Sequence, residues 1–510
     1  MAVDSPQVGR WVKVLDQTRC IGCHACSTAC KSENEVPLGV NRTYVKSVDV
    51  GKFPEARRAF QVTRCNQCTD APCVTACPTR AMYKRSDGIV DFDKSICIGC
   101  KACMAACPYD AIFINPEDHS AEKCNMCAHR LDIGLEPACV TVCPTEAILV
   151  GDLEDSSSKV AELINRRPAV VRRPEKETGP GVFYLGAHQA TLDPLAARRP
   201  DGGLYAWATQ GPADPQLATS GHPVGAVSSA AALVSYDVPH RAPWGWRVSL
   251  YTWTKSLAAG LLMVAVGLTL IGENDWDDPL TRWIAPLGSL AFLAITGVLL
   301  TWDLKHPFRF YLIFTRPQWR SWLVRGAFML SGYGGILGVY LAAVIFDVGW
   351  LQRASGILAV PSALVTAYYT AFLFAQAKAR DLWQSALLPV HLVLQAILAG
   401  AAGLLPFLLA AGYAPHRALV ATEVIMAAAA AQILLVWAEV AMPHVTAHAH
   451  LAIHEMVRGR FAPFFWVGIG GVAVAVAAPW IGWVAVPFVL IGLLAHEHAY
   501  IQAGQAVPLA

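Results

Sequence analysis

Long apolar stretches distinguish the second half of this 510-residue chain from its first half. From about residue 253 onward, apolar runs recur at about the 20 residues that a helix needs to cross a bilayer. Only a tight turn near Pro479 and Trp480 separates the last two runs, so we expect eight spans, with six or seven as alternatives. The expected spans are 253–272, 283–302, 322–346, 355–377, 385–412, 418–442, 463–480 and 481–501.

The first part of the chain has a different pattern, in which short segments alternate with Gly, Pro and Cys. Such punctuation favours small α+β modules over long helices. A stretch rich in Pro, Gly, Ala and Arg follows, and we expect its segment GVFYLG to pack on the first region while the rest forms a tether. The predicted domains are 1–150 for the α+β region, 151–245 for the partly ordered connector and 246–510 for the membrane region.

Composition agrees with this division. Hydrophobic residues make up 55% of the chain and charged residues 15%, whereas soluble proteins have about 25% charged residues. The deficit of charge lies almost wholly after Trp246. The net charge of +2 and the lack of a basic strip with aromatic residues give no indication of nucleic acid binding. The N-terminus has neither an apolar signal-peptide core nor a twin-arginine motif, so no export signal is expected.

Lysines and arginines between the spans predict an orientation, because cytoplasmic loops are enriched in them. With eight spans, the face that carries the N-terminal domain and the C-terminus holds Lys305, Arg309, Arg316, Arg320, Arg325, Lys378, Arg380, Arg458 and Arg460. The opposite face holds Arg282, Arg353 and Arg417, with an acidic GENDWDD segment. We therefore expect a multi-pass protein of a prokaryotic inner membrane with its N-terminal domain in the cytoplasm. The alternatives are that the basic loops hold an acidic partner, or that a folded partner carries the domain outward.

All sixteen cysteines lie in four quartets within the first region. The quartets are Cys20, Cys23, Cys26 and Cys30; Cys65, Cys68, Cys73 and Cys77; Cys97, Cys100, Cys103 and Cys107; and Cys124, Cys127, Cys139 and Cys143. Close spacing lets one loop hold three irons of a cube, and the proline that follows three of the quartets turns the last cysteine toward a neighbouring cluster. The pattern predicts four [4Fe–4S] clusters.

The fourth ligand of each cluster is expected to come from another quartet. The second and third quartets are adjacent, so Cys77 is expected to bind with the third and Cys107 with the second. By elimination, the first and fourth quartets exchange Cys30 and Cys143. Zinc is disfavoured because a third cysteine after two more residues overfills a tetrahedral site. Disulfides are disfavoured because they need an oxidising compartment.

Both halves resemble known families. The segments CIGCHACSTAC, CNQCTDAPCVTACPT, CIGCKACMAACPYDA and CNMCAHRLDIGLEPACVTVCPTEAI resemble the four-cluster electron-transfer subunits of the molybdopterin oxidoreductase family over residues 10–190. The segments WDLKHPFRFYLIFTRPQWRSW and YYTAFLFAQAKARDLWQSALLPVHLVLQAILAG resemble the polysulfide-reductase (NrfD-like) membrane subunits. The resemblance implies two double-cluster α+β ferredoxin-like modules fused to an all-α bundle of about eight transmembrane helices. It also implies binding of menaquinone or ubiquinone, no haem, and a separate catalytic subunit that carries molybdopterin.

Titratable side chains within the apolar spans are the candidates for quinone chemistry, because such groups are costly in a bilayer. The quinone-site candidates are Tyr251, Lys255, Asp303, His306, Tyr368, Tyr369 and His391, and the proton-path candidates are Glu423 and Arg325. Simpler roles remain open for several of them. Lys255 and Arg325 can extend to the membrane interface, the tyrosines can serve packing, and His391 can hydrogen-bond between helices. Tyr251 and Lys255 also stand where the best-known family members have an amide and a histidine.

These features predict a subunit that passes electrons between a catalytic partner and the quinone pool, without acting on the partner's substrate itself. A formate dehydrogenase-like complex in a respiratory chain is the first expectation. A polysulfide, thiosulfate or dimethyl-sulfoxide reductase drawing on menaquinol is the alternative. Two other classes are a haem-containing anchor, for which His391 with His496 or His498 is the candidate pair, and a membrane module that only docks the clusters.

Overall fold

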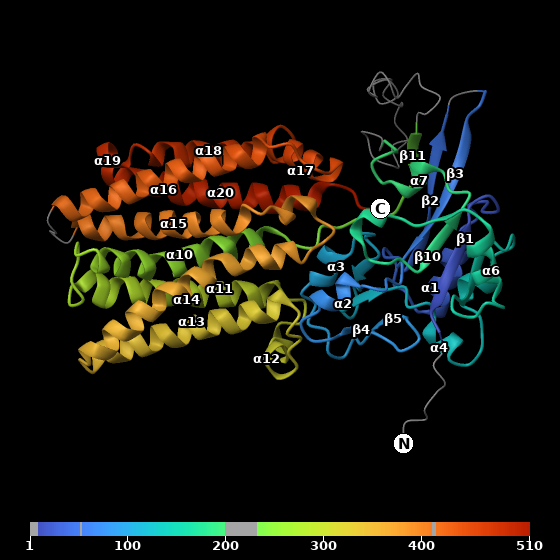
Figure 1. Cartoon of the computed structure of the whole chain (residues 1–510), viewed down its shortest axis with the longest axis horizontal. Coiled ribbons are helices and arrows are strands. Elements are labelled where there is room, and N and C mark those ends of the chain that lie inside the picture. The colour runs from blue at the N-terminus through green and yellow to red at the C-terminus, as the bar shows by residue number, and fades with distance from the viewer. Residues whose placement is uncertain (1–8, 52–53, 199–231, 411–414) are drawn as a thin grey trace. The chain divides into compact units, whose positions relative to one another are not determined.

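A computed structural model describes residues 9–51, 54–198, 232–410 and 415–510 of the chain, without the side chain of Pro415. The structure divides into two compact units (Figure 1). Unit 1 comprises Met1–Arg241 with Pro508–Ala510, and unit 2 comprises Ala242–Val507. Part of the expected connector therefore belongs to unit 1, and its residues 199–231 lie outside the described residues.

Unit 1 contains a four-stranded sheet in the order β8-β1-β10-β9. Its strands are β1 (Trp11–Asp16), β8 (Ile148–Asp152), β9 (Ala169–Val170) and β10 (Val182–Leu185). Strand β10 runs parallel to β1, so the expectation that GVFYLG packs on the cysteine region is confirmed. Val12 and Val14 on β1 pack against Val160 of α6 (Lys159–Arg166), and the alternation of strand side chains directs Lys13 and Leu15 to the other face.

A second sheet in the order β11-β2-β3 lies in the same unit. It consists of β2 (Thr43–Val50), β3 (Arg57–Arg64) and β11 (Ala232–Tyr236). Strands β2 and β3 pair antiparallel along their whole length, from Thr43 opposite Arg64 to Val50 opposite Arg57. The long pairing places Arg64 at the very end of β3, directly before Cys65.

The second and third cysteine quartets are each followed by a small hairpin. Helix α2 (Pro72–Ala76) precedes the β4–β5 hairpin, and α3 (Ala102–Ala106) precedes the β6–β7 hairpin. The hairpin strands are β4 (Met82–Lys84), β5 (Val90–Phe92), β6 (Ile112–Ile114) and β7 (Ala121–Lys123). The remaining elements of unit 1 are α1 (Ala25–Glu33), α4 (Ala128–Leu131), α5 (Ala138–Thr141), η1 (Pro174–Lys176) and α7 (Gln189–Leu192). Cysteines form much of the core here, in place of a large apolar interior.

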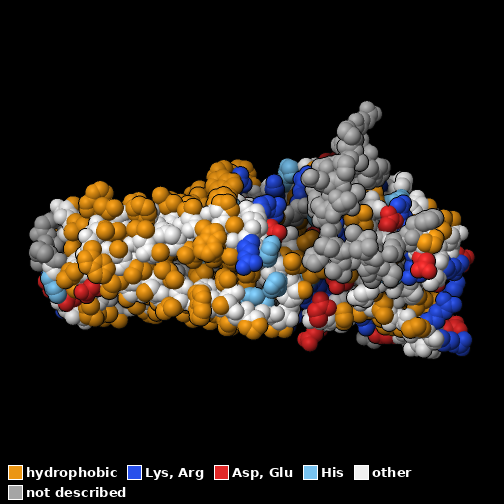
Figure 2. Space-filling view, turned by 90° about the horizontal axis from the view of Figure 1, so that it is seen from above, with side chains coloured by type: hydrophobic (Ala, Val, Ile, Leu, Met, Phe, Trp, Pro, Cys, Tyr) orange, Lys and Arg blue, Asp and Glu red, His pale blue; other side chains and the backbone are white. Residues whose placement is uncertain are grey.

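Unit 2 is a bundle of helices (Figure 1), and the face of it that Figure 2 shows is largely apolar. Its long helices are α10 (Trp246–Leu270), α11 (Ala285–Asp303), α13 (Trp322–Ile345), α14 (Gly349–Ala375), α15 (Leu388–Ala410), α16 (Pro415–Ala441) and α20 (Ala485–Ala506). Its short elements are η2 (Leu280–Ile284), η3 (Pro307–Arg309), α12 (Leu312–Thr315), η4 (Asp381–Gln384), α17 (Ala447–Val457), α18 (Ala462–Ala475), α19 (Ala478–Ile481) and η5 (Gly482–Val484). The expected fold class, an α+β ferredoxin-like region followed by a membrane bundle, is confirmed.

Seven segments among the described residues are long and apolar enough to cross a membrane, and α18 is a shorter apolar helix of 14 residues. The span expected at 463–480 is thus shorter than predicted. Helix α18 ends before Val476 and Ala477, and the backbone turns again at Gly482, where φ is 60°. Pro479 opens the four-residue helix α19 between these breaks, which suits a residue without a backbone N–H.

Helix α10 lies inside the bundle, with 83% of its most apolar window buried. It packs against α11, α14, α15 and α20, so neighbouring helices cover it on several sides. Its closest approach is to α15, where a Cβ on Gly260 would lie 1.9 Å from the carbonyl oxygen of Ala396. Glycine is required at this crossing because any side chain would separate the two helices.

Candidate functional site: thiol groups in unit 1 and polar clusters in unit 2

The four cysteine loops share one backbone feature. The residue before the second cysteine of every quartet has a positive φ: Gly22 (69°), Gln67 (47°), Gly99 (66°) and Met126 (62°). Glycine adopts this conformation at little cost, whereas glutamine and methionine are strained there. The repeated left-handed turn bends each loop back on itself, so that successive thiols from one loop face the same side.

The thiols of the first and fourth quartets form two mixed groups. The Cys20 group is Cys20, Cys23, Cys26 and Cys143, which together line one cavity. The Cys30 group is Cys30, Cys124, Cys127 and Cys139, in which Cys30 interacts electrostatically with each of the other three. In the Cys20 group the backbone N–H of Ala147 donates to Cys143 Sγ at 3.2 Å.

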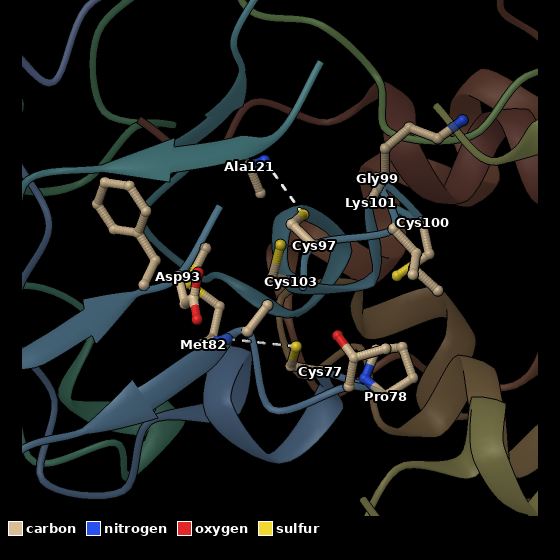
Figure 3. A pocket seen from close by; sticks show the side chains of 14 residues that line it. Cys77, Pro78, Met82, Asp93, Cys97, Gly99, Cys100, Lys101, Cys103 and Ala121 are labelled. Carbon is tan, nitrogen blue, oxygen red and sulfur yellow. Dashed lines mark hydrogen bonds between the residues drawn. The ribbon is translucent and has the colours of Figure 1, made fainter. Parts of the chain in front are cut away.

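The second and third quartets form two further groups. The Cys65 group is Cys65, Cys68, Cys73 and Cys107, in which Cys107 interacts with Cys65 and Cys68. The Cys77 group is Cys77, Cys97, Cys100 and Cys103, which together line one cavity (Figure 3). Figure 3 shows Met82 N donating to Cys77 Sγ (3.3 Å) and Ala121 N donating to Cys97 Sγ (3.4 Å).

Two buried cations contact the sulfur of Cys139. Arg64 Nη1 donates to Cys139 Sγ at 3.2 Å and Lys13 Nζ at 3.5 Å. Burial raises the pKa of Cys139, but Lys13 and Arg64 outweigh it and lower that pKa to about 7. Burial and the neighbouring thiols instead raise the pKa of Cys30 to about 12. The two cations therefore favour an anionic sulfur at Cys139.

These thiol groups fit iron–sulfur clusters. Within the described ranges, no three His, Cys, Asp or Glu side chains are arranged to hold a single metal ion. The thiols of the Cys20 and Cys77 groups instead line cavities and accept hydrogen bonds from backbone N–H groups, which suits a multi-atom anionic centre. Arg64 is 1% exposed, and its Nε and Nη2 have no partner among the described residues. Because a buried cation is costly without an anion, an anionic cluster supplies what this guanidinium lacks.

In unit 2, polar side chains gather around a buried lysine, and we call this set the lysine cluster. Lys255 of α10 is fully buried, and its Nζ donates to Ala367 O and to Thr370 Oγ1 of α14, each at 2.7 Å. Nζ also lies 5.2 Å from the centre of the Tyr369 ring. The cluster consists of Tyr251, Thr252, Lys255, Tyr369, Thr370 and Glu497.

Glu497 of α20 supplies the carboxylate of the lysine cluster. It is 4% exposed, accepts a hydrogen bond from Thr252 Oγ1 at 3.1 Å, and interacts electrostatically with Lys255. Among the described residues, the two form no direct ion pair within 4.0 Å. A buried acid and a buried base thus lie near one another without neutralising each other by contact.

A second set, the histidine cluster, lies on α15, α16 and α20. The rings of His391 and His496 stack with centroids 5.0 Å apart, and His391 Nε2 lies 2.8 Å from Gln432 Nε2. Tyr500 OH donates to Leu382 O at 3.0 Å and lies 3.5 Å from Glu439 Oε1. The cluster consists of His391, Gln432, Glu439, His496 and Tyr500, and Gln395 of α15 lies beside Glu497 of the lysine cluster.

Several buried polar atoms of the histidine cluster lack partners among the described residues. They are His391 Nδ1, Gln432 Oε1 and His496 Nε2. Buried polar atoms are normally hydrogen-bonded, so these atoms are candidates to hydrogen-bond a polar ligand or water.

The structure brings together some of the predicted residues and not others. Tyr251, Lys255 and Tyr369 lie in the lysine cluster, and His391 lies in the histidine cluster. Asp303 at the end of α11 interacts with Tyr251, and His306 follows it in the next loop.

The remaining predicted residues lie outside both clusters. Tyr368 is half-buried and its ring meets that of Phe372. Arg325 Nε donates to Trp319 O at 2.7 Å and its guanidinium lies over Trp322, which holds it at the start of α13. Glu423 is exposed near the start of α16.

Glu497, His496 and Thr370 were not among the predicted quinone-site residues. The signal that could have revealed two of them is the segment HEH inside the apolar run of α20, since ionisable residues within a span are functional candidates by default. Thr370 carries no such signal, because only the approach of Lys255 from another helix gives it a role.

Comparisons with known proteins agree with this geometry. The family profile described as 4Fe-4S dicluster domain matches residues 57–153, and the profile described as Polysulphide reductase, NrfD matches residues 235–508. The sequence is 43% identical to a tetrathionate reductase subunit of Salmonella typhimurium over 193 residues, covering 37% of this chain and 77% of the relative. It is 43% identical to a polysulfide reductase subunit of Wolinella succinogenes over 175 residues, covering 34% of this chain and 92% of the relative. It is 37% identical to the arsenate respiratory reductase iron–sulfur subunit of a Shewanella species over 220 residues, covering 34% of this chain and 94% of the relative.

Proposed function

The protein belongs to the polysulphide reductase NrfD family and carries a fused 4Fe-4S dicluster region, and from this premise we propose that it connects a quinone pool to a catalytic reductase subunit. The observation that carries the proposal is the occurrence, in one chain, of four mixed thiol groups and a membrane bundle with buried acid–base clusters.

In unit 1, the Cys20, Cys30, Cys65 and Cys77 groups would each hold one [4Fe–4S] cluster. Bound clusters supply carriers for single electrons. The protein's own part is to bury most of the thiolates, to donate backbone N–H groups to sulfur, and to place Lys13 and Arg64 near the added negative charge. Each group takes three thiols from one quartet and one from another, so neighbouring clusters share loops.

In unit 2, the lysine and histidine clusters are the proposed place where a quinone carbonyl would be hydrogen-bonded and its protons exchanged. Oxidation of a quinol releases two electrons and two protons, so acceptors must lie at both oxygens. Tyr251, Lys255, Tyr369 and His391 provide donors or acceptors, with Asp303 and His306 at the end of the neighbouring helix. Menaquinone or ubiquinone is the proposed ligand.

The partner is proposed to be a molybdopterin-containing reductase of a sulfur compound such as polysulfide or tetrathionate. The relatives named above are subunits of tetrathionate, polysulfide and arsenate reductases. Formate dehydrogenase, the first expectation from the sequence, finds no support among them, and the reductase alternative is favoured. Electrons would then run from quinol to the partner.

The protein is a multi-pass membrane protein. We place it in the inner membrane of a prokaryote, with unit 1 on the cytoplasmic side as the distribution of basic loop residues indicates. A cysteine or a reporter attached at either terminus, and tested for labelling in intact cells, distinguishes this orientation from its reverse.

The decisive experiment uses the purified full chain in detergent without any partner. We expect about sixteen iron atoms and as many sulfides per chain. A menaquinol analogue should reduce the clusters, followed by loss of absorbance near 400 nm. If the clusters are intact and no quinol reduces them, the bundle serves only as a docking module. A Soret band that responds to quinol would favour the haem-containing anchor.

A further inference from the structure

Positive charge is unevenly distributed among the four thiol groups of unit 1. Lys13 and Arg64 are each 1% exposed, and both donate to the same sulfur, Cys139 of the Cys30 group. The amide of Asn34 also lies 3.7 Å from Cys30 Sγ and 3.6 Å from Cys127 Sγ. Three side-chain donors, two of them cationic, therefore converge on one group.

The fold explains why these cations are buried. Lys13 occupies the face of β1 opposite Val12 and Val14, and the pairing of β1 with β8 and β10 turns that face inward. Arg64 ends β3 immediately before Cys65. Neither residue lies within 70 positions of Cys139, so only the folded chain brings the charges to it.

The other groups receive less positive charge. The Cys77 group has the backbone donors of Met82 and Ala121. The Cys65 group has one buried cation, Lys123, which interacts electrostatically with Cys65, Cys68 and Cys73. Lys123 also donates to the carbonyl oxygens of Val90 and Cys124, so this group receives one cation where the Cys30 group receives two. In the Cys20 group, Cys23 is exposed to solvent, which screens charge.

We propose that Lys13 and Arg64 make the cluster of the Cys30 group the one with the highest reduction potential of the four. The inference rests on the proposed function, in which each thiol group holds a cluster. An added electron adds one negative charge, and cations a few ångströms from a ligand sulfur in a buried site stabilise the reduced form over the oxidised form. Electrons entering the protein would accumulate there first, so this cluster holds them ready for the partner.

The test is a potentiometric titration of the purified full chain followed by electron paramagnetic resonance. Arg64→Gln and Lys13→Met should each lower the midpoint potential of the same signal, which in the wild type is the highest of the four. We expect about a tenfold drop in the reduced-to-oxidised ratio at fixed potential, equal to about 59 mV for one electron. Arg64→Lys, which keeps the charge, should restore most of the potential.

The matched control is Arg58→Gln, because Arg58 lies on the same strand, is 54% exposed and pairs with Asp49. It should move no signal. Arg64 also interacts with Cys26, so a smaller shift in the signal of the Cys20 group is expected with Arg64→Gln and not with Lys13→Met. If Arg64→Gln fails to fold, Lys13→Met alone decides the outcome.

The results separate the inference from the function on which it rests. Suppose that the wild type contains sixteen iron atoms and gives four paramagnetic signals. If neither Lys13→Met nor Arg64→Gln shifts the midpoint potential of any of them, the inference is wrong but the proposed function stands. The same holds if the signal that moves is not the highest one. Iron far below sixteen atoms in the wild type overturns the proposed function and this inference together.

Discussion

Units 1 and 2 both bury charged groups, but they compensate them with different chemistry. In unit 1, Lys13 and Arg64 contact a cysteine sulfur, which is a proposed metal ligand and cannot exchange protons while it is bound. In unit 2, Lys255 contacts a carbonyl and a hydroxyl, with a carboxylate nearby. The first arrangement places two cations against one sulfur, and the second places a buried acid near a buried base without direct contact.

This difference matches the two halves of quinol chemistry. Oxidation of a quinol separates electrons from protons, and each must leave by its own route. A fixed cation beside sulfur stabilises an added electron, whereas a buried acid and base without direct contact can change protonation state. The predictions below test whether the two units divide the work in this way.

The largest effect is expected from loss of a cluster ligand in unit 1. Replacing Cys103 by Ser should lower the iron content from about sixteen to about twelve atoms per chain or fewer, because one cube loses an anchor. The thiols form much of the local core, so unit 1 should become sensitive to protease while the helices of unit 2 keep their circular dichroism at 222 nm. If the variant loses both the protease resistance of unit 1 and the circular dichroism of the helices, the two units do not fold independently.

A strong but more selective effect is expected in the lysine cluster. Lys255→Met should slow quinol-dependent reduction of the clusters on the order of 10²-fold, the range for loss of a proton-transfer group. Iron content and cluster potentials should not change. Lys305→Met removes an exposed lysine of the same unit and should leave the rate unchanged. A rate within twofold of the wild type would remove Lys255 from the proposed site.

Removal of Lys255 also leaves Glu497 as a buried acid without its nearby cation, which should destabilise the bundle because a buried charge is costly without an opposite charge. The double variant Lys255→Met with Glu497→Gln removes both charges and should fold better than either single variant. If it recovers stability without recovering the quinol rate, the pair acts in proton transfer. If the rate recovers with the stability, the pair is structural.

The cysteine ligands and the membrane spans are predictable because their signals are local. The repeated spacing in CIGCHACSTAC and its counterparts needs no knowledge of the fold, and apolar runs reveal the long helices. The length of α18 was missed because the breaks at Val476–Ala477 and Gly482 interrupt a run that stays apolar throughout.

The residues that were missed depend on long-range packing. Lys13 becomes buried only because β1 pairs with strands more than 130 positions away, and Glu497 meets Lys255 only because the first and last long helices pack together. Hydrophobicity places Glu423 in a span as readily as Glu497, but the structure exposes the first and buries the second. A sequence pattern identifies a costly side chain, and only tertiary contacts identify its neighbours.

A pH-dependent effect is expected at His240 in unit 1. Its Nδ1 lies 2.5 Å from Asp110 Oδ2 and its Nε2 lies 3.1 Å from Asp237 Oδ1, with the Tyr44 ring also beside it. Burial lowers the pKa of His240, but the two carboxylates outweigh it and raise that pKa to about 9. Because the pKa of His240 is higher in the folded state, its protonated ring stabilises the fold fully below a pH of about 6.5. This contribution is lost as the pH rises through about 9.

The contribution should reach roughly 3 kcal/mol at low pH. Denaturant unfolding of unit 1, followed by cluster absorbance between pH 6 and 10, should show this loss in the wild type and a flatter profile in His240→Gln. His129→Gln alters a half-exposed histidine of the same unit and should keep the wild-type slope. If the free energy of unfolding depends on pH equally in all three proteins, His240 is not the group responsible for the loss of stability.

The smallest effect is expected from adding a single methyl group to α13. A Cβ on Gly326 would lie 2.2 Å from Tyr369 Cε2, whereas a Cβ on Gly332 of the same helix meets nothing within 4 Å. Gly326→Ala should therefore destabilise the bundle by about 1–3 kcal/mol and shift the Tyr369 ring against Lys255, lowering the quinol rate. Gly332→Ala should be neutral or stabilising by up to about 1 kcal/mol, since alanine favours a helix over glycine. Thermal unfolding in detergent, with the rate measured on the same samples, tests both. If Gly326→Ala lowers stability and leaves the rate intact, Tyr369 packs against α13 without contributing to the quinone site.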